Sequence, residues 1–513
     1  MFDRRTALFL GVLVATTVPA AAATLNVPAQ HPTIQDAILA ATDGDVVEVN
    51  PGTYTESIDF LGKAIIVRGT FGAAATVISG SNTNTVVTFI NGEGLDSILE
   101  GFTIRDGHAP GTGLQDGGGG IFVNNASPTI RGNIIRNNTA HWNGAGVYLV
   151  NSQSLILGND FIDNSFTPII ADAPFGRGAG INISGGAPTV SRNTFTGNMG
   201  ADEGGGLYCC DAQTATIDHN QCIGNVSGYG GGMAIDGNSL VIATNNLLAG
   251  NTAIGHSGFA GPSEGLGGGL YIAGPSSAGL SNFTIVGNST TPGWNGPGNG
   301  GGVYADTIVA LVPQLENCIV RDNVSALNPQ LFGNLSLLYS NVTGTVGGTN
   351  FDTDPLFVTG PDGDFYLSHL SAGQGANSPN IDAGNPLSPL ILDTTTRTDQ
   401  IVDTGIIDVG FHYQALPSFA FQRGDCNFDG STNLADAIFL LTFLFPPTVP
   451  APPPLGCPDA CDGNDDGGLN ISDAVAILNA LFGSPPLPLP APVGACGGDP
   501  TSDSLTCFNF PSC

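Results

Sequence analysis

The sequences GGGLY at residues 204–208 and NQCIGN at 220–225 are one copy of the two motifs that decide the fold. A glycine cluster followed by apolar residues occurs seven times between residues 118 and 304. An apolar stretch flanked by asparagines occurs seven times between 133 and 323, and its closing asparagines stand 26, 34, 27, 26, 37 and 35 residues apart. A repeat of about 26 residues with loop insertions explains these spacings, and such internal periodicity is typical of solenoids and other repeat folds.

Each repeat contains two or three short segments in which apolar and polar residues alternate, for example 146–150 and 154–157. Alternation with a period of two indicates β-strands, and no repeat shows the 3.6-residue period of a helix. Strands this short cannot bury a face alone, but stacked repeats form a continuous core. We therefore predict an all-β right-handed parallel β-helix with about 4.8 Å between coils. A β-propeller is the alternative, although its blades need about 40–45 residues each.

Composition and charge restrict the partners of this chain. Its 513 residues include 75 glycines, 43 acidic residues and only 12 lysines and arginines, for a formal net charge of −31. Nucleic-acid binding needs a basic face that displaces counterions, so we expect no nucleic-acid partner. Anionic membrane surfaces are disfavoured for the same reason. Calcium and polysaccharides with few charges are the partners that this composition permits.

Residues 1–23 have the organisation of an export signal. Arg4 and Arg5 precede an apolar run at 8–18, and three alanines at 21–23 supply a cleavage site. The run is too short to cross a bilayer, so the pattern predicts a signal peptide that is removed. We expect a mature chain that is secreted or held at the cell surface, without a transmembrane segment and in a compartment that permits disulfides.

The residues after the signal predict a cap for the β-helix. Residues 31–45 read as one amphipathic helix with Thr33 as its N-cap. Strands are expected at 46–49 and 64–68. A helix at this point would cover the open end of a solenoid, whose first strand edge is otherwise exposed.

Four further motifs carry a family resemblance. The sequences PTIQDAI at 32–38 and PGTYTE at 51–56 resemble the N-terminal region of pectin-lyase-like and pectinesterase-like β-helix proteins. The sequences DPLF at 354–357 and SPNIDAG at 378–384 resemble the closing segment of bacterial surface β-helix proteins. The resemblance covers about 25–412 and implies a β-helix domain over 24–412. It specifies the fold and leaves the activity open, because β-helices carry unrelated functions.

Two loops near the C-terminus share one pattern of polar residues, D-x-N-x-D-G-x-x-N-x-x-D, at 425–436 and 462–473. Ca²⁺ takes six to eight oxygen ligands around a tight turn, with the turn made by a glycine at position 6. Positions 1, 3, 5, 7 and 12 therefore predict two calcium sites. The predicted ligands are Asp425, Asn427, Asp429, Ser431 and Asp436 in the first loop and Asp462, Asn464, Asp466, Gly468 and Asp473 in the second.

The paired loops, each followed by an apolar helical segment, resemble a type I dockerin, which has Asp where an EF-hand has Glu. The resemblance implies a calcium-dependent docking module at 425–483 and a cohesin-like or other cell-surface protein as its partner. A proline-rich insert at 446–454 departs from the dockerin pattern. We expect a linker at 413–424 and a proline-rich spacer with a cysteine-containing tail at 484–513. An even, local set of cysteines in an exported chain predicts three disulfides among Cys426, Cys457, Cys461, Cys496, Cys507 and Cys513.

The β-helix region contains no intact catalytic motif of a polysaccharide-degrading enzyme. A lyase needs a base, often Arg or Lys, and a hydrolase needs two carboxylates about 5–9.5 Å apart. The best candidates are Arg177, which lies in a long insertion, and the pair Asp202 and Glu203, which precedes a glycine cluster. The alternative is that these acids are solvated turn residues.

Aromatic residues near the glycine clusters suggest binding of sugar rings. We predict that a row of them lies along one edge of the solenoid as a substrate-binding platform: Trp142, Phe175, Tyr229, Phe259 and Trp294. The alternative is that these rings only pack the insertion loops. The favoured function is polysaccharide recognition or surface attachment. A pectate-lyase-like or glycoside-hydrolase enzyme and a purely structural adhesion protein are the alternatives.

Overall fold

The computed structural model describes residues 22–111, 117–166, 176–200, 202–255, 264–294, 296–306, 312–415, 421–427, 429–445, 457–494 and 496. Nearly all of the predicted signal peptide lies outside these residues, as do Phe175 and Phe259. Among the residues that are described, no helix is both long enough and apolar enough to cross a membrane.

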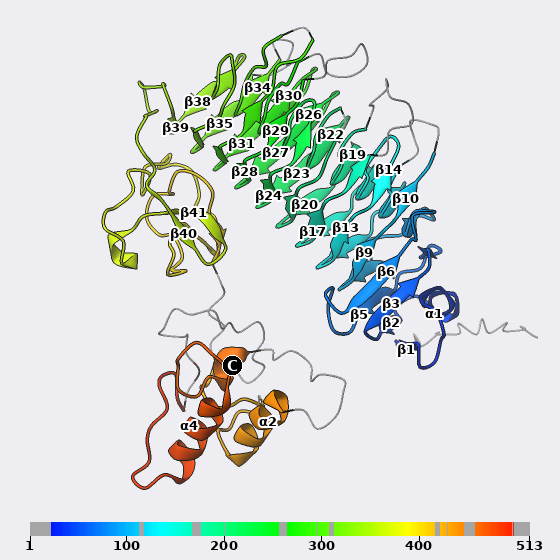
Figure 1. The fold of residues 1–513 in the computed structure, drawn as a ribbon, viewed down its shortest axis with the longest axis vertical. Helices are drawn as coiled ribbons and strands as arrows, with labels where there is room; N and C mark the ends of the chain where they lie inside the picture. Colours follow the sequence, from blue (N-terminus) through cyan, green and yellow to red (C-terminus); the bar gives the residue numbers. More distant parts are fainter. Residues whose placement is uncertain are drawn as a thin grey trace, which may run out of the picture.

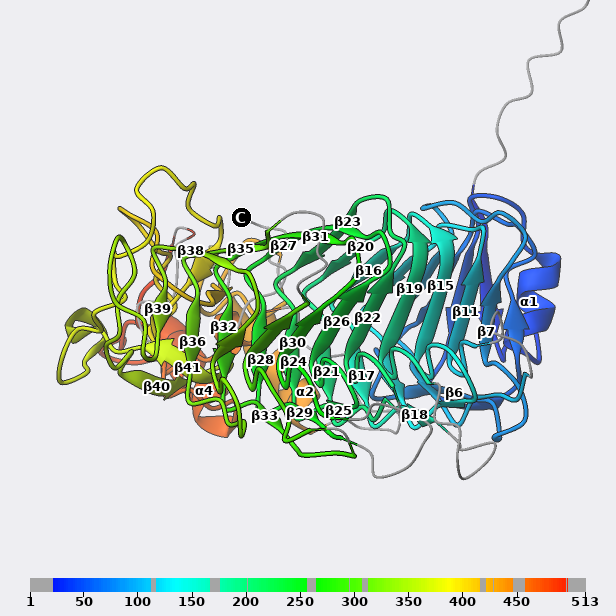
Figure 2. The same ribbon diagram turned by 90° about the horizontal axis from the view of Figure 1, so that it is seen from above.

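The predicted right-handed parallel β-helix is confirmed, and a small helical module follows it along the chain (Figure 1). Three long parallel sheets, here called A, B and C, contain 12, 11 and 10 strands. Each strand pairs with the strand one coil earlier and one coil later, so the sheets run along the whole rod (Figure 2). The chain passes from A to B to C within each coil.

The strands of the three long sheets are short, and they follow one another in coil order. Sheet A consists of β1 (Thr24–Val27), β2 (Val46–Val49), β5 (Ile66–Gly69), β8 (Ile98–Glu100), β12 (Thr129–Arg131), β16 (Leu155–Leu157), β20 (Thr189–Ser191), β23 (Ala215–Asp218), β27 (Leu240–Thr244), β31 (Ser277–Ser281), β35 (Gln314–Glu316) and β38 (Ser336–Leu338). Sheet B consists of β3 (Gly52–Thr55), β6 (Thr76–Ser79), β9 (Thr103–Arg105), β13 (Ile134–Arg136), β17 (Asp160–Ile162), β21 (Thr194–Thr196), β24 (Gln221–Ile223), β28 (Leu247–Ala249), β32 (Thr284–Val286), β36 (Ile319–Arg321) and β39 (Asn341–Val342). Sheet C consists of β4 (Ile58–Asp59), β7 (Val87–Phe89), β11 (Ile121–Asn124), β15 (Val147–Ser152), β19 (Ile181–Gly186), β22 (Leu207–Cys210), β26 (Met233–Asp236), β30 (Leu270–Ile272), β34 (Val303–Ala305) and β37 (Leu331–Phe332).

Two small parallel sheets lie between B and C in the coil. They consist of β10 (His108–Ala109), β14 (Thr139–Ala140) and β18 (Ser165–Phe166), and of β25 (Val226–Ser227), β29 (Thr252–Ala253) and β33 (Ser289–Thr290). The insertion loops that vary the repeat length leave the coil after these strands.

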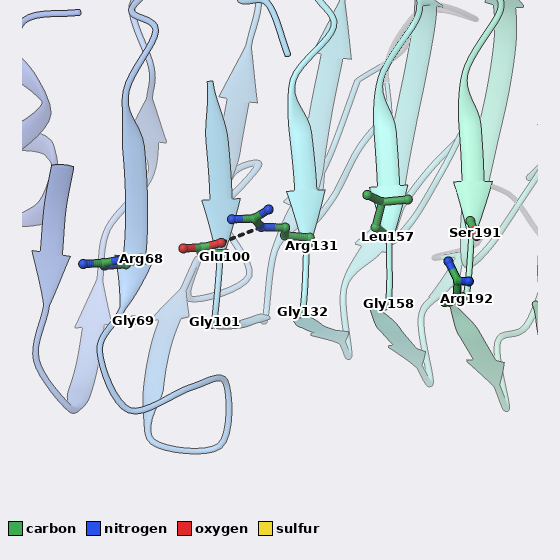
Figure 3. Close-up of a pocket in the computed structure, with 10 residues that line it drawn as sticks. All are labelled: Arg68, Gly69, Glu100, Gly101, Arg131, Gly132, Leu157, Gly158, Ser191 and Arg192. Carbon is green, nitrogen blue, oxygen red and sulfur yellow. Dashed lines mark hydrogen bonds and ion pairs between the residues drawn. The ribbon is translucent and has the colours of Figure 1, made fainter. Parts of the chain in front are cut away.

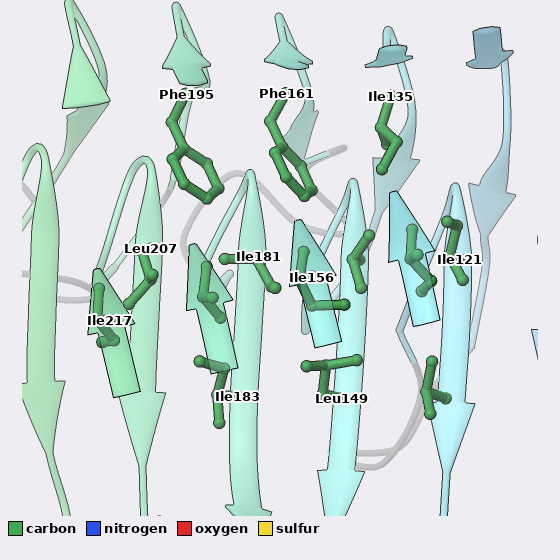
Figure 4. Packing of buried hydrophobic residues seen from close by; sticks show 14 of the residues in the cluster. Ile121, Ile135, Leu149, Ile156, Phe161, Ile181, Ile183, Phe195, Leu207 and Ile217 are labelled. Atoms are coloured by element: carbon green, nitrogen blue, oxygen red, sulfur yellow. The ribbon is translucent and has the colours of Figure 1, made fainter. Parts of the chain in front are cut away.

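The interior of the solenoid is filled by the inward side chains of all three sheets (Figure 4). The middle residue of a three-residue strand points inward, as in β13 and β17, where Ile135 and Phe161 are fully buried. Like residues stack between coils, and the rings of Phe161 and Phe195 are 4.5 Å apart with 14° between their planes. The period-two pattern of the sequence therefore becomes a continuous apolar column.

The predicted N-terminal cap helix is present as α1 (Ile34–Ala40). The Thr33 hydroxyl accepts a hydrogen bond from the Asp36 N–H, as expected of an N-cap. The helix buries Ile34 and packs on β1, β2 and β4. It is shorter than predicted because the Asp45 carboxylate accepts hydrogen bonds from the N–H groups of Thr42 and Ala23, which holds the chain in a turn.

Two ladders of buried asparagines line the turns on either side of sheet B. The second ladder follows the strands of sheet B along the chain. In it, the Asn198 Oδ1 accepts hydrogen bonds from both the backbone N–H and the side-chain amide of Asn164, and the Asn198 amide donates to the Asn225 Oδ1. Its members are Asn138, Asn164, Asn198, Asn225, Asn251, Asn288 and Asn323. Each amide also donates to a backbone carbonyl of an earlier coil, so both its polar atoms are satisfied.

The first ladder ends earlier than the repeat of the sequence suggests. Its members are Asn133, Asn159, Asn193, Asn220 and Asn246. The register of β27 with β31 places Asn282 opposite Asn245, so Phe283 takes the ladder position in that coil. The seven-residue stretches at 282–288 and 317–323 are therefore not equivalent to the six-residue ones. Their first asparagines have left-handed backbones with φ of 56° and 55°, outside the ladder.

A lobe of mostly irregular structure follows the last parallel strand. It contains the antiparallel pairs β40 (Phe357–Gly360) with β41 (Gly363–Leu367) and β42 (Thr394–Thr395) with β43 (Tyr413–Gln414), and one 3₁₀ turn (Leu370–Ala372). The lobe is hydrogen-bonded to the solenoid through Asn245 and Asn282, which share one register position just before the first ladder. Asn245 and the backbone of His412 exchange two hydrogen bonds of 2.6 and 2.7 Å, and the Asn282 amide donates to the Asp408 carbonyl.

The C-terminal module is a pair of loop–helix units. It contains α2 (Leu434–Leu444), α3 (Pro458–Cys461) and α4 (Ile471–Phe482), and α2 packs against α4 around Leu440 and Ile477 (Figure 1). Cys426 and Cys461 form a disulfide, and Cys457 and Cys496 are also disulfide-bonded.

The expected linker at 413–424 is partly folded at both ends. Tyr413 belongs to β43 of the lobe, and Arg423 is buried in the C-terminal module. The Arg423 guanidinium donates to the carbonyl of Asp462 and pairs with the Asp465 carboxylate, which explains why a charged residue is buried there.

Candidate functional site

The glycine clusters place charged residues on adjacent rungs beside sheet C. Isolated bridges connect Asn143, Arg177, Glu203 and Tyr229 in successive coils. Gly204, which follows Glu203, has a φ of +66°, and a Cβ at Gly205 would lie 2.4 Å from the Gly231 carbonyl oxygen of the next coil. Only glycine permits this turn and this close approach. The cluster therefore brings residues from separate coils into contact.

The structure brings together the three predicted catalytic candidates. The Arg177 Nε lies 3.4 Å from the Glu203 Oε2 and 3.8 Å from the Asp202 Oδ2. The same guanidinium lies over the ring of Tyr208 at 5.5 Å, within the range of a cation–π contact. The Arg177 side chain is 42% exposed, whereas Glu203 is 7% exposed, so the cluster reaches from solvent into the protein.

Three buried polar atoms in this cluster have no hydrogen-bond partner among the described residues. They are the Asn182 Oδ1 on β19, the Glu203 Oε2 and the Tyr208 hydroxyl on β22. A buried polar group without a partner costs about 1–3 kcal/mol, so such atoms are rare and they gather at functional sites. Their convergence beside Arg177 marks this place as the candidate functional site.

Burial raises the pKa of the Glu203 carboxyl to about 7, with Arg177 opposing the shift and Asp202 adding to it. A carboxyl group with this pKa exchanges its proton near neutral pH, as a general acid or base must. Burial also raises the pKa of the Tyr208 hydroxyl, which therefore stays protonated and can donate a hydrogen bond.

An aromatic ladder runs through the site on the outer face of sheet C. Its rings occupy one register position in successive strands, with Asn182 and Ala234 in between: Phe122, Tyr148, Tyr208, Tyr271, Tyr304 and Phe332. Tyr271 stacks on Tyr304 at 5.6 Å, and Tyr304 stacks on Phe332 at 4.9 Å. The aromatic row predicted from the sequence did not include this ladder, although an aromatic residue ends five of the seven glycine motifs.

The predicted row of five aromatics does not form one register column. Tyr229 shares its position with Glu203, whereas Trp142 stands one residue before the equivalent Asn143. Tyr229 stacks on Tyr271 at 5.1 Å and so extends the ladder described above. Trp294 is 61% exposed and precedes the equivalent residue Asn299 by five positions. Insertions precede some glycine clusters and not others: Gly300 follows Thr290 by ten positions, whereas Gly230 follows Ser227 by three, so sequence position did not give the register.

A second concave surface, which the sequence did not indicate, follows the turn between sheets A and B (Figure 3). This turn groove has a volume of about 560 Å³ and is lined by glycines and by Arg68, Glu100, Arg131 and Arg192. Arg68 pairs with Glu48 and Arg131 pairs with Glu100, at 2.5 and 2.6 Å. In later coils the lobe covers the same turn through Asn245, and Arg192 donates to Gln414 of the lobe.

The two predicted calcium loops have matching hydrogen bonds. The first aspartate of each loop accepts from the backbone N–H groups of positions 5 and 6, as Asp425 does from Asp429 and Gly430. The last aspartate, Asp436 or Asp473, accepts from position 9 and forms the capping box of the following helix. The chain is therefore wrapped around one centre in each loop.

The donor set of the loops fits Ca²⁺. Asp425, Asp436, Asp462 and Asp473 are fully buried, and carboxylate oxygens of Asp462, Asp466 and Asp473 all lie within 4.8 Å of one another. Burial, together with Asp462, raises the pKa of Asp473 to about 6. Converging buried carboxylates repel one another, and a hard cation with oxygen ligands relieves that repulsion. Ser431 and Gly468 stand at position 7, where the loop offers its carbonyl.

Comparison with known proteins identifies the family to which this chain belongs. The structure is a right-handed parallel β-helix, and the family model described as "Right handed beta helix region" matches residues 63–353. The chain therefore belongs to the right-handed β-helix family. No curated protein matches it.

Two solved structures illustrate the likeness in fold. The pectate lyase Pel9A is 16% identical, with a TM-score of 0.39, and the match covers 73% of this chain and 89% of that one. A pectin methylesterase from carrot is 12% identical, with a TM-score of 0.25, over 64% of this chain and 90% of that one. Matches this distant do not extend to activity.

Proposed function

We propose that this protein is an exported polysaccharide-binding protein that recognises its ligand beside sheet C, at Arg177, Asp202 and Glu203. The observation that carries the proposal is a buried carboxyl group paired with a partly exposed guanidinium, beside two buried polar atoms, the Asn182 Oδ1 and the Tyr208 hydroxyl, that have no hydrogen-bond partner among the described residues. Sugar hydroxyls can donate and accept hydrogen bonds, so they suit a site with a carboxyl oxygen, an amide oxygen and a phenol.

The neighbouring groups favour a saccharide over an apolar ligand. Tyr229 and Tyr271 present stacked rings close to Glu203, and aromatic faces pack against the apolar faces of sugars. Arg177 offers several N–H donors in a fixed plane, which suits hydroxyl pairs and uronate carboxylates. Asp202 and Glu203 supply acceptors on the same side of that guanidinium.

Binding of the full-length protein to a panel of uronate and neutral polysaccharides tests this proposal. We expect Arg177→Ala and Glu203→Gln each to weaken binding at least tenfold, as the loss of a central contact does. The matched control is Arg68→Ala with Arg131→Ala, which alters the turn groove and leaves sheet C intact. The Trp142→Ala, Trp294→Ala double variant measures the contribution of the originally predicted aromatics.

The outcomes distinguish the two surfaces. Unchanged affinity in Arg177→Ala, combined with lost affinity in the Arg68→Ala, Arg131→Ala variant, would place recognition in the turn groove. Absence of binding to every polysaccharide would leave a structural or adhesion role as the better description.

A second function is favoured by the geometry around Glu203, a buried carboxyl group 3.4 Å from the Arg177 Nε whose pKa burial raises to about 7. A carboxyl group with this pKa beside Arg177 can act as the general acid or base of a polysaccharide lyase or an O-glycosyl hydrolase. Incubation with the same panel, scored for unsaturated products and for new reducing ends, tests catalysis. Turnover that disappears in Glu203→Gln would support an enzyme, and no product from any substrate would exclude this role on that panel.

For the C-terminal module we propose calcium-dependent attachment to a cohesin-like or other cell-surface protein. The matching hydrogen bonds of the two loops and their buried aspartates support two Ca²⁺ sites. Calorimetric titration should find two sites, and Asp429→Ala should remove one of them. Asp96→Ala, an exposed aspartate of the solenoid, is the control. A protein that is indifferent to chelator would contradict this part of the proposal.

A further inference from the structure

A cluster of metal-ligand side chains lies in the lobe, outside the sites discussed above. One oxygen each of Asp403 and Asp408 and one imidazole nitrogen of His412 all lie within 4.8 Å of one another. Asp408 and His412 are buried, and the Asp403 side chain is only 9% exposed. Ligands of one ion stand about 3–5 Å apart when metal–ligand distances are about 2.0–2.5 Å, so this separation fits a single ion.

The hydrogen bonds of His412 define which nitrogen is available. Its Nδ1 lies 3.1 Å from the Gly410 carbonyl oxygen, which can only accept, so the Nδ1 carries the proton. In the neutral ring the Nε2 then holds a lone pair, and it faces the Asp403 Oδ2 at 3.2 Å. A lone pair opposite a carboxylate oxygen is a repulsive contact, which either a proton or a metal cation bound by both atoms would relieve. In many metal-binding histidines, the ring nitrogen that does not bind the metal donates a hydrogen bond to a carbonyl oxygen, as the His412 Nδ1 does here.

The basic groups around the cluster are engaged elsewhere or lie at a distance: the His369 Nε2 bonds to the Thr396 hydroxyl and lies 3.8 Å from the Asp408 Oδ2. The nearby Arg397 guanidinium forms a bidentate pair with Asp399, with the Nε 2.9 Å from the Oδ1 and the Nη2 2.5 Å from the Oδ2. A bound divalent cation would balance the two carboxylates.

Further residues hold Asp408 in position. Its Oδ1 accepts from the Asp382 N–H at 2.7 Å, and its Oδ2 accepts from the Thr396 hydroxyl at 2.5 Å. Because that hydroxyl donates to Asp408, it must accept from the His369 Nε2, which lies 3.1 Å away. His369 therefore acts through Thr396 and orients the carboxylate, as second-layer partners do around metal ligands.

We propose that Asp403, Asp408 and His412 bind a divalent transition ion of the Zn²⁺ class. One imidazole and two carboxylates suit such an ion, whereas the C-terminal loops offer oxygen atoms alone and suit Ca²⁺. The backbone of His412 is hydrogen-bonded to Asn245, and the carbonyl of Asp408 accepts a hydrogen bond from the Asn282 amide. The ion would therefore bind where the lobe meets the solenoid. Its role is structural: it ties together a segment with little regular structure.

Titration of the tag-free, full-length protein with Zn²⁺ tests this site, in buffer already saturated with Ca²⁺. Co²⁺ serves as a second probe, because its visible absorption reports coordination by nitrogen and oxygen. We expect one Zn²⁺ per chain, a higher melting temperature, and at least tenfold weaker binding in Asp403→Asn and His412→Gln. His369→Gln should weaken binding less than these two ligand variants.

Asp393→Asn is the matched control, since Asp393 is an exposed aspartate of the same lobe. It should keep the wild-type response to Zn²⁺. Zn²⁺ binding that persists in Asp403→Asn and His412→Gln would overturn the proposal, as would absence of binding in the wild type. Polysaccharide binding is measured separately, so the two proposals can fail independently.

Discussion

The solenoid and the C-terminal module bury polar side chains in opposite ways. The solenoid buries neutral amides, and Asn198 both accepts from the coil before it and donates to the coil after it. The module buries carboxylates, and Asp425, Asp436, Asp462 and Asp473 are all fully enclosed. An amide carries donors and an acceptor in one group, so a stack of amides satisfies itself, whereas carboxylates only accept and repel one another.

This difference separates two kinds of stability. The solenoid should be stable without any ion, because its ladders and apolar columns are complete in the protein. The module has a small apolar core around Leu440 and Ile477, and its charge is balanced only when cations are bound. If the proposed Ca²⁺ sites exist, the module is ordered only where enough Ca²⁺ is present, because ion binding then contributes to its folding free energy.

Removal of Ca²⁺ is the strongest test of the comparison. We expect chelator to unfold α2 and α4 while the β-structure of the solenoid remains, because two sites occupied at 1,000 times their dissociation constant contribute about 8 kcal/mol. Thermal melts followed by circular dichroism, with and without chelator, should show loss of one transition only. A solenoid transition that moves with chelator would contradict the separation.

Interruption of an asparagine ladder should be the next largest effect. Asn198→Ala removes four side-chain hydrogen bonds and leaves the Phe161 carbonyl and the Asn164 N–H buried without their partner. We expect a loss of about 3–5 kcal/mol in the free energy of unfolding, measured by denaturant titration. The loss should be the same with and without Ca²⁺.

Asn238→Ala is the control for the ladder variant, because Asn238 lies exposed in a turn. It should change stability by less than about 0.5 kcal/mol. Equal effects of the two substitutions would mean that the ladder contributes no more than an ordinary surface asparagine.

Glu203 is a buried carboxyl group of the solenoid whose Oε2 accepts no hydrogen bond among the described residues, whereas the buried Glu93 accepts from the N–H groups of Gly62 and Asn91. Its folded-state pKa of about 7 lies above its ordinary value of 4.5, so the folded state holds the proton more tightly. The associated stability is present below pH 4.5 and is lost as the pH rises to 7. At pH 8, Glu203→Gln should be more stable than the wild type by roughly 2–3 kcal/mol, and the two should converge at pH 4.

Denaturant titrations of both proteins at pH 4, 6 and 8 measure this convergence. Asp96→Asn, at an exposed site, should follow the wild type at every pH. A constant difference between Glu203→Gln and the wild type across this range would show that Glu203 titrates like a solvated acid.

Much of the fold followed from the sequence because it depends on short-range patterns. Strands with alternating apolar residues, glycine clusters and paired asparagines recur along the solenoid, so many copies of one local pattern favour the same conformation. The register was harder: the extra residue between Asn282 and Asn288 moved Phe283 into the ladder, and only strand pairing reveals this shift.

The sites were less accessible to sequence reasoning, since they depend on which coils lie side by side. Arg177 and Glu203 were selected from their positions near the glycine clusters, and they do meet. The aromatic ladder was visible in the motifs but required the stacking of strands to be interpreted. Asp403, Asp408 and His412 belong to no repeat, and their convergence comes from the irregular path of the lobe.

The exposed ion pairs of the turn groove should give the smallest effect and complete the comparison. Arg131 and Glu100 lie on adjacent strands of sheet A, 2.6 Å apart, with side chains 48% and 22% exposed. Solvent screens such a pair, so a double-mutant cycle with Arg131→Ala and Glu100→Ala should give a coupling of about 0.2–1 kcal/mol that falls with added salt. A salt-insensitive coupling above about 2 kcal/mol would mean that the groove excludes water in solution. Its arginines would then be held as rigidly as the buried amides, and the turn groove would become a stronger candidate for binding than its exposure suggests.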